Sequence, residues 1–462
     1  MAQLDELPDN SVPSIAVEVV EAGIRSHRGW VRCEIGGNIE FNIHHLESYC
    51  FAEWNPTVYD ALLVAAAVEF ADKTQRRPAL MWQRDIELRI PVHDPALWAD
   101  PAVLEALRDT LAILTGDHWE IGFYKRSRPL DPPRQGHFSL PDGSIAVIPF
   151  SDGLDSRAVA GLMAREMGTK LIRVRLGSKS YNPPPSRLPE PFTSVPYKVR
   201  KGDHEFVESS ARSRGFKFAL ISGLAAYLAK AGKVIVPESG QGALGPALVT
   251  VGHAYEDYRS HPIFTEQMEK FLAALLRHRV RFEFPRLWYT KAETLREFVT
   301  ECDGGSSWSE TWSCWQQNRH ASVDGKKRHC GICAACMLRR LSVHAAGLTE
   351  PPETYVWENL GAASFEAGAA ASFDRKRITR KLHQYAIAGA LHLDHLAGLR
   401  SSPANALTLS LSAFQLSRLL NLPEAEARTK LDRLLAQHEN EWNAFAASLG
   451  ADSFIANWAG SP

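Results

Sequence analysis

The chain has 462 residues, 45% of them hydrophobic and 23% charged, and its formal net charge is −1. These values are typical of a globular protein with more than one domain, and the balanced charge argues against a general attraction to nucleic acid or to an anionic membrane. No apolar run approaches the ~18 residues of a membrane-spanning helix. The polar, acidic start predicts no secretory signal, and seven cysteines without a disulfide framework favour a reducing, cytoplasmic location.

Residues 1–140 predict an N-terminal α+β accessory domain. Alternating apolar and polar residues at 30–35 and 86–92 indicate strands. Apolar residues at helical spacing indicate helices at 60–70 and 103–115. A stretch rich in Pro, Arg and Gly follows over 126–143 and predicts a linker.

Between 141 and 350 the pattern changes to strands that alternate with helices. The short apolar runs at 145–150, 171–176 and 233–237 indicate buried strands. Helical spacing over 155–167 and 213–231 places a helix after each of the first two. This alternation predicts the α/β class, with a doubly wound parallel sheet.

The last part of the chain, 351–462, is rich in Ala and Leu and predicts a helical region. Its last clear helix begins near Pro423. One apolar stripe of this helix carries Leu431, Leu434, Leu435, Trp442 and Phe445.

Four cysteines within 302–347 predict a zinc knuckle. Cys330, Cys333 and Cys336 form two overlapping C-x2-C pairs, and Cys314 can close the site. Four thiolates complete a tetrahedral zinc shell and leave no open position, so the site is expected to be structural. His320 and His329 flank the cysteines but are not needed as ligands.

A turn with small polar residues follows the first predicted strand of the α/β region. Its residues Ser151, Gly153 and Ser156 precede or begin the helix at 155–167. Free backbone N–H groups and the helix dipole favour an anion at such a helix start. The pattern is not a Walker loop, and the turn alone is equally typical of a plain strand–helix connection.

The same turn resembles the SGGxDS pyrophosphate loop of the ATP pyrophosphatase (PP-loop) superfamily. Together with the cysteine run, the chain resembles the 7-cyano-7-deazaguanine synthase (QueC) family over about 144–347. Stretches 213–218, 238–242 and 285–293 occupy the positions of three further family motifs.

The resemblance implies an ATP-binding loop, a HUP-like fold and a set of site residues. The loop residues are Phe150, Ser151, Asp152, Gly153, Leu154, Asp155 and Ser156. The implied catalytic residues are Lys291, Asp155 and Arg214, and the implied substrate-binding residues are Glu238, Gly240, Gln241 and Lys291. The resemblance also implies three ligands: ATP as co-substrate, Mg²⁺ with its phosphates, and a structural zinc ion. Without the resemblance, Glu238, Arg214 and Lys291 read equally well as cap or surface residues.

Two departures from the family pattern are visible. Asp152 replaces the first glycine of the loop, where a carboxylate either helps to hold Mg²⁺ or weakens ATP binding by repulsion. Fifteen residues separate Cys314 from Cys330, and this longer spacer includes the basic run 326–328.

The resemblance implies activation of 7-carboxy-7-deazaguanine as an acyl adenylate and its transfer to an amine. Stretches 81–86, 114–120 and 355–360 look like the long QueC-like proteins of anti-phage systems, the QatC and type IV CBASS groups. That subfamily implies an amide conjugate with the N-terminus of a partner protein. The alternatives are nitrile synthesis from ammonia, with the added domains serving a homodimer, and an inactive nucleotide-binding scaffold.

Other polar groups carry less functional weight. His392 and His395 lack a third metal-binding partner, and His45 with Glu47 lies far from any C-x2-C pair. The basic runs 326–328 and 339–340 offer a nucleic-acid contact, but a solvated face of the zinc knuckle explains them more simply.

Overall fold

The structure is a computed structural model. It describes residues 12–41, 55–78, 83–127, 143, 145–151, 153–176, 192–195, 197–208, 212–252, 254–303, 307–316 and 320–459. The chain forms two compact units. The first consists of Met1–Val147, Val174–Val234 and Phe264–Arg281, and the second of Ile148–Arg173, Ile235–Ile263 and Phe282–Pro462. Each unit is thus assembled from three stretches of chain, and the consecutive ranges 1–140, 141–350 and 351–462 stay a prediction.

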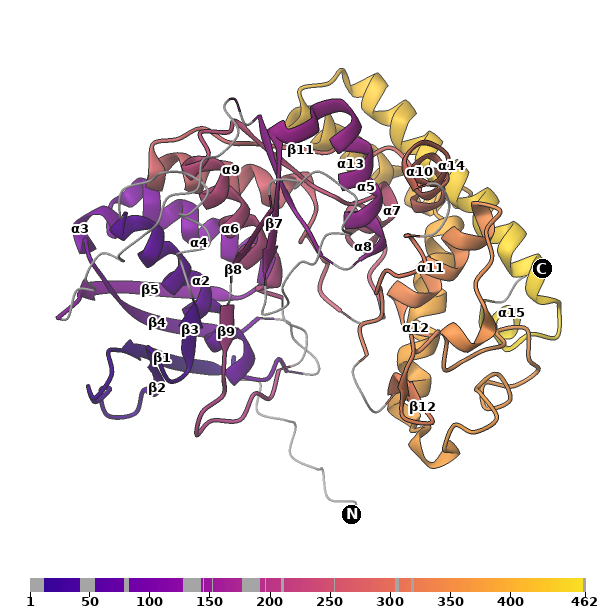
Figure 1. Cartoon of the computed structure of the whole chain (residues 1–462), viewed down its shortest axis with the longest axis horizontal. Coiled ribbons are helices and arrows are strands. Elements are labelled where there is room, and N and C mark those ends of the chain that lie inside the picture. Colours follow the sequence, from indigo (N-terminus) through magenta and orange to yellow (C-terminus); the bar gives the residue numbers. More distant parts are fainter. Residues whose placement is uncertain are drawn as a thin grey trace, which may run out of the picture. The chain divides into compact units, whose positions relative to one another are not determined.

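A four-stranded sheet organises the first unit (Figure 1). Its order is β2-β1-β4-β5, with bounds Val31–Glu34, Ser14–Val20, Asp85–Val92 and His118–Lys125. All three strand pairs are parallel. This region is therefore α/β in character where the sequence predicted α+β, because local alternation reveals a strand but not the direction of its neighbour.

Helix α2 (Pro56–Thr74) is buried on almost every side: fifteen of its nineteen residues are buried. Such an apolar helix needs neighbours all round, and it packs on β4 and on α6 (Arg214–Leu228). Asn55 caps its start by accepting a hydrogen bond from the Thr57 amide at 2.9 Å. Helix α4 (Pro101–Thr115) packs on β5 and α6, while α3 (Pro95–Trp98) and α9 (Pro262–Leu276) bring Trp98 and Phe271 together.

A buried ion network ties these elements together. Arg84 donates to Asp72 at 2.6 Å and to Asp117 at 2.7 Å, and all three side chains are fully buried. Arg77 reaches the same two carboxylates. The Asp72 carboxylate also accepts from the Ser213 amide at 2.9 Å, which fixes the chain just before α6. Each buried charge is thus paired, as burial requires.

A second sheet has five strands in the order β11-β10-β6-β7-β8. Strands β10 and β6 pair in parallel, with Lys233 opposite Ala146 and Val234 opposite Val147. The bounds are Arg281–Glu283, Lys233–Ile235, Ala146–Pro149, Leu171–Leu176 and Phe192–Val195. Two short antiparallel pairs join β3 (Ile39–Phe41) to β9 (Tyr197–Val199) and β12 (Ser322–Val323) to β13 (Lys326–Lys327). The parallel sheets with flanking helices confirm the α/β class.

Helices dominate the second unit (Figure 1). Helix α10 packs on α5 and α11, and α14 packs on α11, α12 and α13. The bounds are α5 Leu154–Met167, α7 Gly240–Ala243, α8 Gly245–Leu248, α10 Lys291–Phe298, α11 Ala334–Ala345, α12 Arg380–Ala397, α13 Ala406–Leu420, α14 Glu424–Leu449 and α15 Phe454–Ala459. The C-terminal helical region is confirmed, and the predicted stripe of α14 is buried in all five positions. Among the described helices, none combines the length and the apolar character needed to cross a membrane.

Candidate functional site

The predicted phosphate turn lies between β6 and α5. Gly153 is the N-cap of α5, and its amide donates to the Ser151 hydroxyl at 3.2 Å. That hydroxyl also shares a hydrogen bond of 2.9 Å with the Ser156 hydroxyl in the first turn of α5. The two hydroxyls therefore lie together at the positive end of the helix, where an anion is favoured. Asp152 lies outside the described residues.

Apolar contacts hold this turn in place. Phe150 is buried, and the Arg173 guanidinium lies 5.2 Å from the centre of its ring. Leu154 is buried in a cluster with Leu295 and Trp308. The turn is therefore anchored by a buried apolar side chain on each side.

A buried ion pair lies at the start of α5. The Lys291 ammonium pairs with one oxygen of Asp155, and the exposed fractions of the two side chains are 8% and 13%. The second oxygen, Asp155 Oδ1, is buried without a hydrogen-bond partner among the described residues. Mg²⁺ prefers hard oxygen ligands of this kind. Asp155 is therefore a suitable ligand for the Mg²⁺ that is predicted to accompany ATP. The structure thus brings two of the predicted catalytic residues into direct contact.

Lys291 owes its position to the local sequence. It is the first residue of α10, directly after the N-cap Thr290. The Thr290 hydroxyl accepts from the Glu293 amide at 3.2 Å, and the Glu293 carboxylate accepts from the Thr290 amide at 2.8 Å. This reciprocal capping box fixes where the helix begins, and therefore where the lysine side chain starts.

Glu238 belongs to the same electrostatic neighbourhood. Burial raises the pKa of its carboxyl to about 8, and the negative charge of Asp155 adds to this, while Lys291 and Arg259 oppose it. Gly242 leaves the room that this side chain occupies, since a Cβ there would lie 2.1 Å from Glu238 Oε1. A neutral carboxylic acid at physiological pH can both donate and accept hydrogen bonds.

The two other predicted substrate residues lie beside Glu238 but are engaged by protein groups. Gln241 is buried and accepts from the Lys291 amide at 2.8 Å, and its own amide contacts His438 Nδ1 at 2.7 Å. A Cβ on Gly240 would lie 2.2 Å from the Leu287 carbonyl oxygen, so only glycine fits there. In this structure both residues build the site, and a direct contact with substrate stays a prediction.

Arg214 belongs to the first unit, where it begins α6. Its guanidinium carbon lies 5.3 Å from the centre of the Phe218 ring. Its predicted contact with a phosphate or carboxylate stays a prediction.

The four predicted zinc ligands form one buried cluster, with sulfur atoms all within 4.8 Å of one another. The Cys330 and Cys336 sulfurs are 3.8 Å apart, which matches the edge of about 3.8 Å expected for a tetrahedron with Zn–S bonds of about 2.3 Å. Backbone amides of Cys330, Cys333 and Cys336 each point at a preceding sulfur at 3.2–3.4 Å. The donor set and geometry fit a structural zinc ion. Neither flanking histidine belongs to the cluster.

Sequence reasoning missed an aromatic stack between the cysteines and the phosphate turn. The ring of Trp312 stacks on His329 at 4.3 Å, and the Lys327 ammonium lies 4.0 Å from the centre of the Trp312 ring. The Trp312 carbonyl oxygen is 4.0 Å from the position of a Cβ on Gly153. The segment leading into the zinc knuckle thus lies against the turn, which the spacing of the cysteines alone does not reveal.

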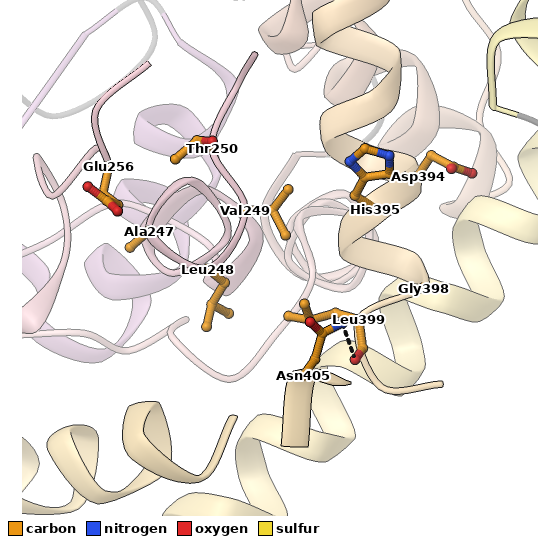
Figure 2. Close-up of a pocket in the computed structure, with 10 residues that line it drawn as sticks. All are labelled: Ala247, Leu248, Val249, Thr250, Glu256, Asp394, His395, Gly398, Leu399 and Asn405. Carbon is orange, nitrogen blue, oxygen red and sulfur yellow. Dashed lines mark hydrogen bonds between the residues drawn. The ribbon is translucent and has the colours of Figure 1, made fainter. Parts of the chain in front are cut away.

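A cavity of about 530 Å³ in the second unit contains none of the predicted site residues (Figure 2). Two of its polar side chains already make hydrogen bonds within the protein. Asp394 accepts from the Trp442 indole at 2.9 Å, and Asn405 donates to the Leu399 carbonyl oxygen at 3.2 Å. The phosphate turn is therefore the better candidate site.

Comparison with known proteins gives a family match to part of the chain, which includes residues of both units. Residues 242–347 match the family model described as "Queuosine biosynthesis protein QueC". This range contains Lys291 and all four cysteines, but it begins after the phosphate turn, Glu238 and Gln241.

Curated proteins named 7-cyano-7-deazaguanine synthase are similar to shorter segments. The protein from Agrobacterium fabrum is 28% identical over 119 residues, which cover 26% of this chain and 38% of that protein. The protein from Sinorhizobium fredii is 44% identical over 45 residues, covering 10% and 16%. The protein from Hydrogenovibrio crunogenus is 32% identical over 74 residues, covering 16% and 28%. The matched segments thus span well under half of each relative, and no solved structure gives a significant match.

Proposed function

We propose that this QueC-like protein of the PP-loop superfamily uses ATP to activate 7-carboxy-7-deazaguanine and joins the acyl group to an amine. The observation that carries the proposal is the ion pair between Lys291 and Asp155 at the start of α5, the helix that follows the phosphate turn. Backbone amides, two hydroxyls and a buried ammonium then meet the phosphates together. The similarity to proteins named 7-cyano-7-deazaguanine synthase supports the substrate class.

The reaction has two steps with balanced bonds. A carboxylate oxygen of the substrate bonds to the α-phosphorus of ATP, and the bond to the departing pyrophosphate breaks. The amine nitrogen then attacks the acyl carbon, AMP leaves, and the nitrogen releases a proton to water. The turn of Ser151 and Ser156 binds the departing pyrophosphate, and Asp155 holds the Lys291 side chain at its edge. Mg²⁺, held by Asp155, would screen the phosphate charge. Catalysis then rests on positioning and on charge stabilisation.

The acceptor that we favour is the N-terminal amine of a partner protein, in an anti-phage pathway. Support comes from the resemblance of stretches 81–86, 114–120 and 355–360 to the long defence-type proteins. A catalytic region with large additional segments also suits a protein acceptor. The second candidate is nitrile synthesis from ammonia, and similarity to proteins named 7-cyano-7-deazaguanine synthase favours a nitrile product.

The test is mass spectrometry of a reaction containing ATP, magnesium and 7-carboxy-7-deazaguanine, with and without ammonium. Without ammonium we expect pyrophosphate and the acyl adenylate, and no nitrile with it. When a protein encoded beside this one is added, we expect AMP and a deazaguanine mass adduct on that protein. Full conversion to the nitrile with ammonium would establish the second candidate. Failure to bind ATP by calorimetry would instead favour an inactive scaffold.

Two lysine variants connect this test to the site. Lys291→Met removes the buried ammonium, and we expect AMP formation to fall on the order of 10²-fold. Lys430→Met is the matched control, because Lys430 is a half-exposed lysine of α14 that pairs with Glu426. Equal activity of the two variants would contradict the assignment of Lys291.

A further inference from the structure

The long C-terminal helix α14 contacts the start of α10 through two buried hydrogen-bonded routes. Glu441 Oε1 accepts from the Thr290 hydroxyl at 2.7 Å. His438, one turn earlier on α14, contacts Gln241, which in turn accepts from the Lys291 amide. The two routes end on consecutive residues, the N-cap Thr290 and the first residue of α10, Lys291. Helix α14 lies outside the region 242–347 that matches the QueC family.

We propose that His438 and Glu441 of α14 are positioning residues for Lys291. This inference rests on the proposed function, because it assigns them to the lysine that we place at the phosphates. It adds to the site a part of the chain that follows the family region, and it gives helix α14 a part in the reaction.

The route through His438 has a single direction. The Lys291 amide donates to Gln241 Oε1 at 2.8 Å, which leaves the Gln241 NH₂ group to donate to His438 Nδ1 at 2.7 Å. His438 Nε2 must then carry the proton, and it donates to the Leu393 carbonyl oxygen at 2.9 Å. Burial lowers the pKa of His438 to about 4, so the ring stays neutral near neutral pH. One tautomer therefore connects α12, α14, α7 and α10.

The second route holds the N-cap itself. The Thr290 side chain is fully buried, and its hydroxyl donates to Glu441 while accepting from the Glu293 amide. Gln437 donates to the same Glu441 oxygen at 3.0 Å. Fixing the Thr290 hydroxyl and the Lys291 amide together leaves the first turn of α10 little freedom to shift or rotate. A displacement of about 1 Å at a reacting group can cost on the order of 10²-fold in rate.

Two substitutions of His438 separate positioning from packing. In His438→Asn the side-chain oxygen takes the place of Nδ1, so the bond from Gln241 is kept and the bond to Leu393 is lost. His438→Gln places its amide near Nε2, so the bond to Leu393 is kept and the acceptor for Gln241 is lost. Glutamine also fills more of the histidine volume, so a purely structural role predicts that the glutamine variant is the better enzyme.

We expect the opposite order. The kcat for AMP formation should fall about tenfold in His438→Gln, the equivalent of one lost hydrogen bond. It should stay within about threefold of wild type in His438→Asn, and KM for ATP should change little in either variant. A glutamine variant at least as active as the asparagine variant would overturn the proposal, as would equal losses in both.

Hydrogen exchange at the Lys291 amide gives a readout that needs no activity. The amide should exchange faster in His438→Gln than in His438→Asn, because only the first variant frees Gln241 to turn away. If the wild-type protein forms no AMP, the proposed function fails while this comparison still decides whether His438 holds Lys291. Unchanged protection in both variants would overturn the positioning role even in an active enzyme.

Discussion

Single hydroxyl and carboxyl groups set the chemistry of the candidate site. Ser151 and Ser156 share one hydrogen bond at the start of α5, and Asp155 keeps one buried oxygen without a partner among the described residues. Such groups are costly to bury unless a ligand completes them. The residues that remain incomplete in the protein alone are therefore the ones whose removal should change activity more than stability.

Ser151→Ala tests this expectation. The variant loses a hydroxyl that contacts Ser156 and the Gly153 amide, and we expect pyrophosphate release to fall on the order of 10²-fold. The melting temperature should change little, because the turn is anchored by buried Phe150 and Leu154. Ser410→Ala is the control for general effects of removing a hydroxyl, because Ser410 is a partly exposed residue of α13 whose hydroxyl also makes two hydrogen bonds, to Ala406 and from Arg428. Full activity of Ser151→Ala would show that the turn does not bind the phosphates.

Glu238 predicts a pH dependence of stability. Its pKa rises from an ordinary 4.5 to about 8, because burial and Asp155 disfavour the charged form. Between these values the folded protein holds a proton that the unfolded chain releases, so stability falls as the pH rises through this window. Melting temperatures of wild type and Glu238→Gln, measured from pH 5 to pH 9, should converge at the acidic end. Parallel curves would contradict the raised pKa.

The same group predicts the pH dependence of substrate binding. A guanine-like N1–H and amino group both donate, so they bind the ionised carboxylate best. We expect the affinity for 7-carboxy-7-deazaguanine to strengthen up to about tenfold per pH unit below pH 8. Isothermal titration calorimetry at pH 6, 7 and 8 measures this slope, and the slope should vanish in Glu238→Gln.

At the scale of elements, the zinc knuckle is the part most dependent on a ligand. Helix α11 begins directly after Cys333, and four buried sulfurs share one small volume. Burial raises the pKa of the Cys330 and Cys336 thiols, whereas hydrogen bonds from the neighbouring thiols lower that of Cys314. A zinc ion removes this conflict by binding all four as thiolates.

Cys330→Ser should therefore lose the metal and destabilise the knuckle, because metal binding and local folding are linked. Elemental analysis and thermal unfolding measure the two effects. Cys302→Ser is the control, since Cys302 lies in the same unit but outside the cluster. A Cys330→Ser protein that is free of zinc and as stable as wild type would contradict a structural role.

Elements with a strong local pattern were predictable. The strand expected at 171–176 is β7, the helix expected at 155–167 is α5 with one more residue at its start, and the stripe of α14 is buried as expected. A short apolar run, a turn glycine and helical spacing are local patterns, and each is sufficient to predict its element from neighbouring residues alone. Strands β1 and β5 were missed, and so was the parallel pairing of the N-terminal sheet, which depends on residues distant in sequence.

The candidate site was predictable only in part, for the same reason. The cysteines and the phosphate turn are local motifs, and the family resemblance implied Lys291 and Asp155 as separate site residues. Their ion pair was not predicted. The contact between Thr290 and Glu441 joins residues 151 positions apart. Helical periodicity predicts a helix that includes His438 and Glu441, but it does not indicate which residues they contact. For Gln241 the resemblance implied a contact with substrate, but in the structure both its amide oxygen and its amide nitrogen are hydrogen-bonded to protein groups.

At the scale of the whole molecule, the first unit should set the acid limit of stability. Burial alone would raise the pKa of Asp72, but Arg84 and Arg77 outweigh it and hold this pKa below its ordinary 3.8. The stabilisation is present above pH 3.8 and is lost as the pH falls through the lower folded value.

Asp72→Asn leaves buried arginines without a full charge partner, and we expect it to lower the free energy of unfolding by about 3–5 kcal/mol. Urea denaturation at pH 7 measures the difference, and the acid-induced loss of stability should be weaker in the variant. Asp109→Asn is the control, because Asp109 is exposed on α4 of the same unit. A change below about 1 kcal/mol would show that the network does not support the fold.

The hydrogen bonds from α14 to α10 also have a consequence for synthesis on the ribosome. Translation proceeds at about 5–20 residues per second, so the 151 positions between Thr290 and Glu441 take on the order of ten seconds to appear. During that interval the lysine-bearing helix lacks its final supports, and the nascent chain cannot hold the arrangement that we assign to activation of the acid. In the function that we propose, activation of the acid therefore begins only after α14 has been made, and the reactive adenylate forms with that delay.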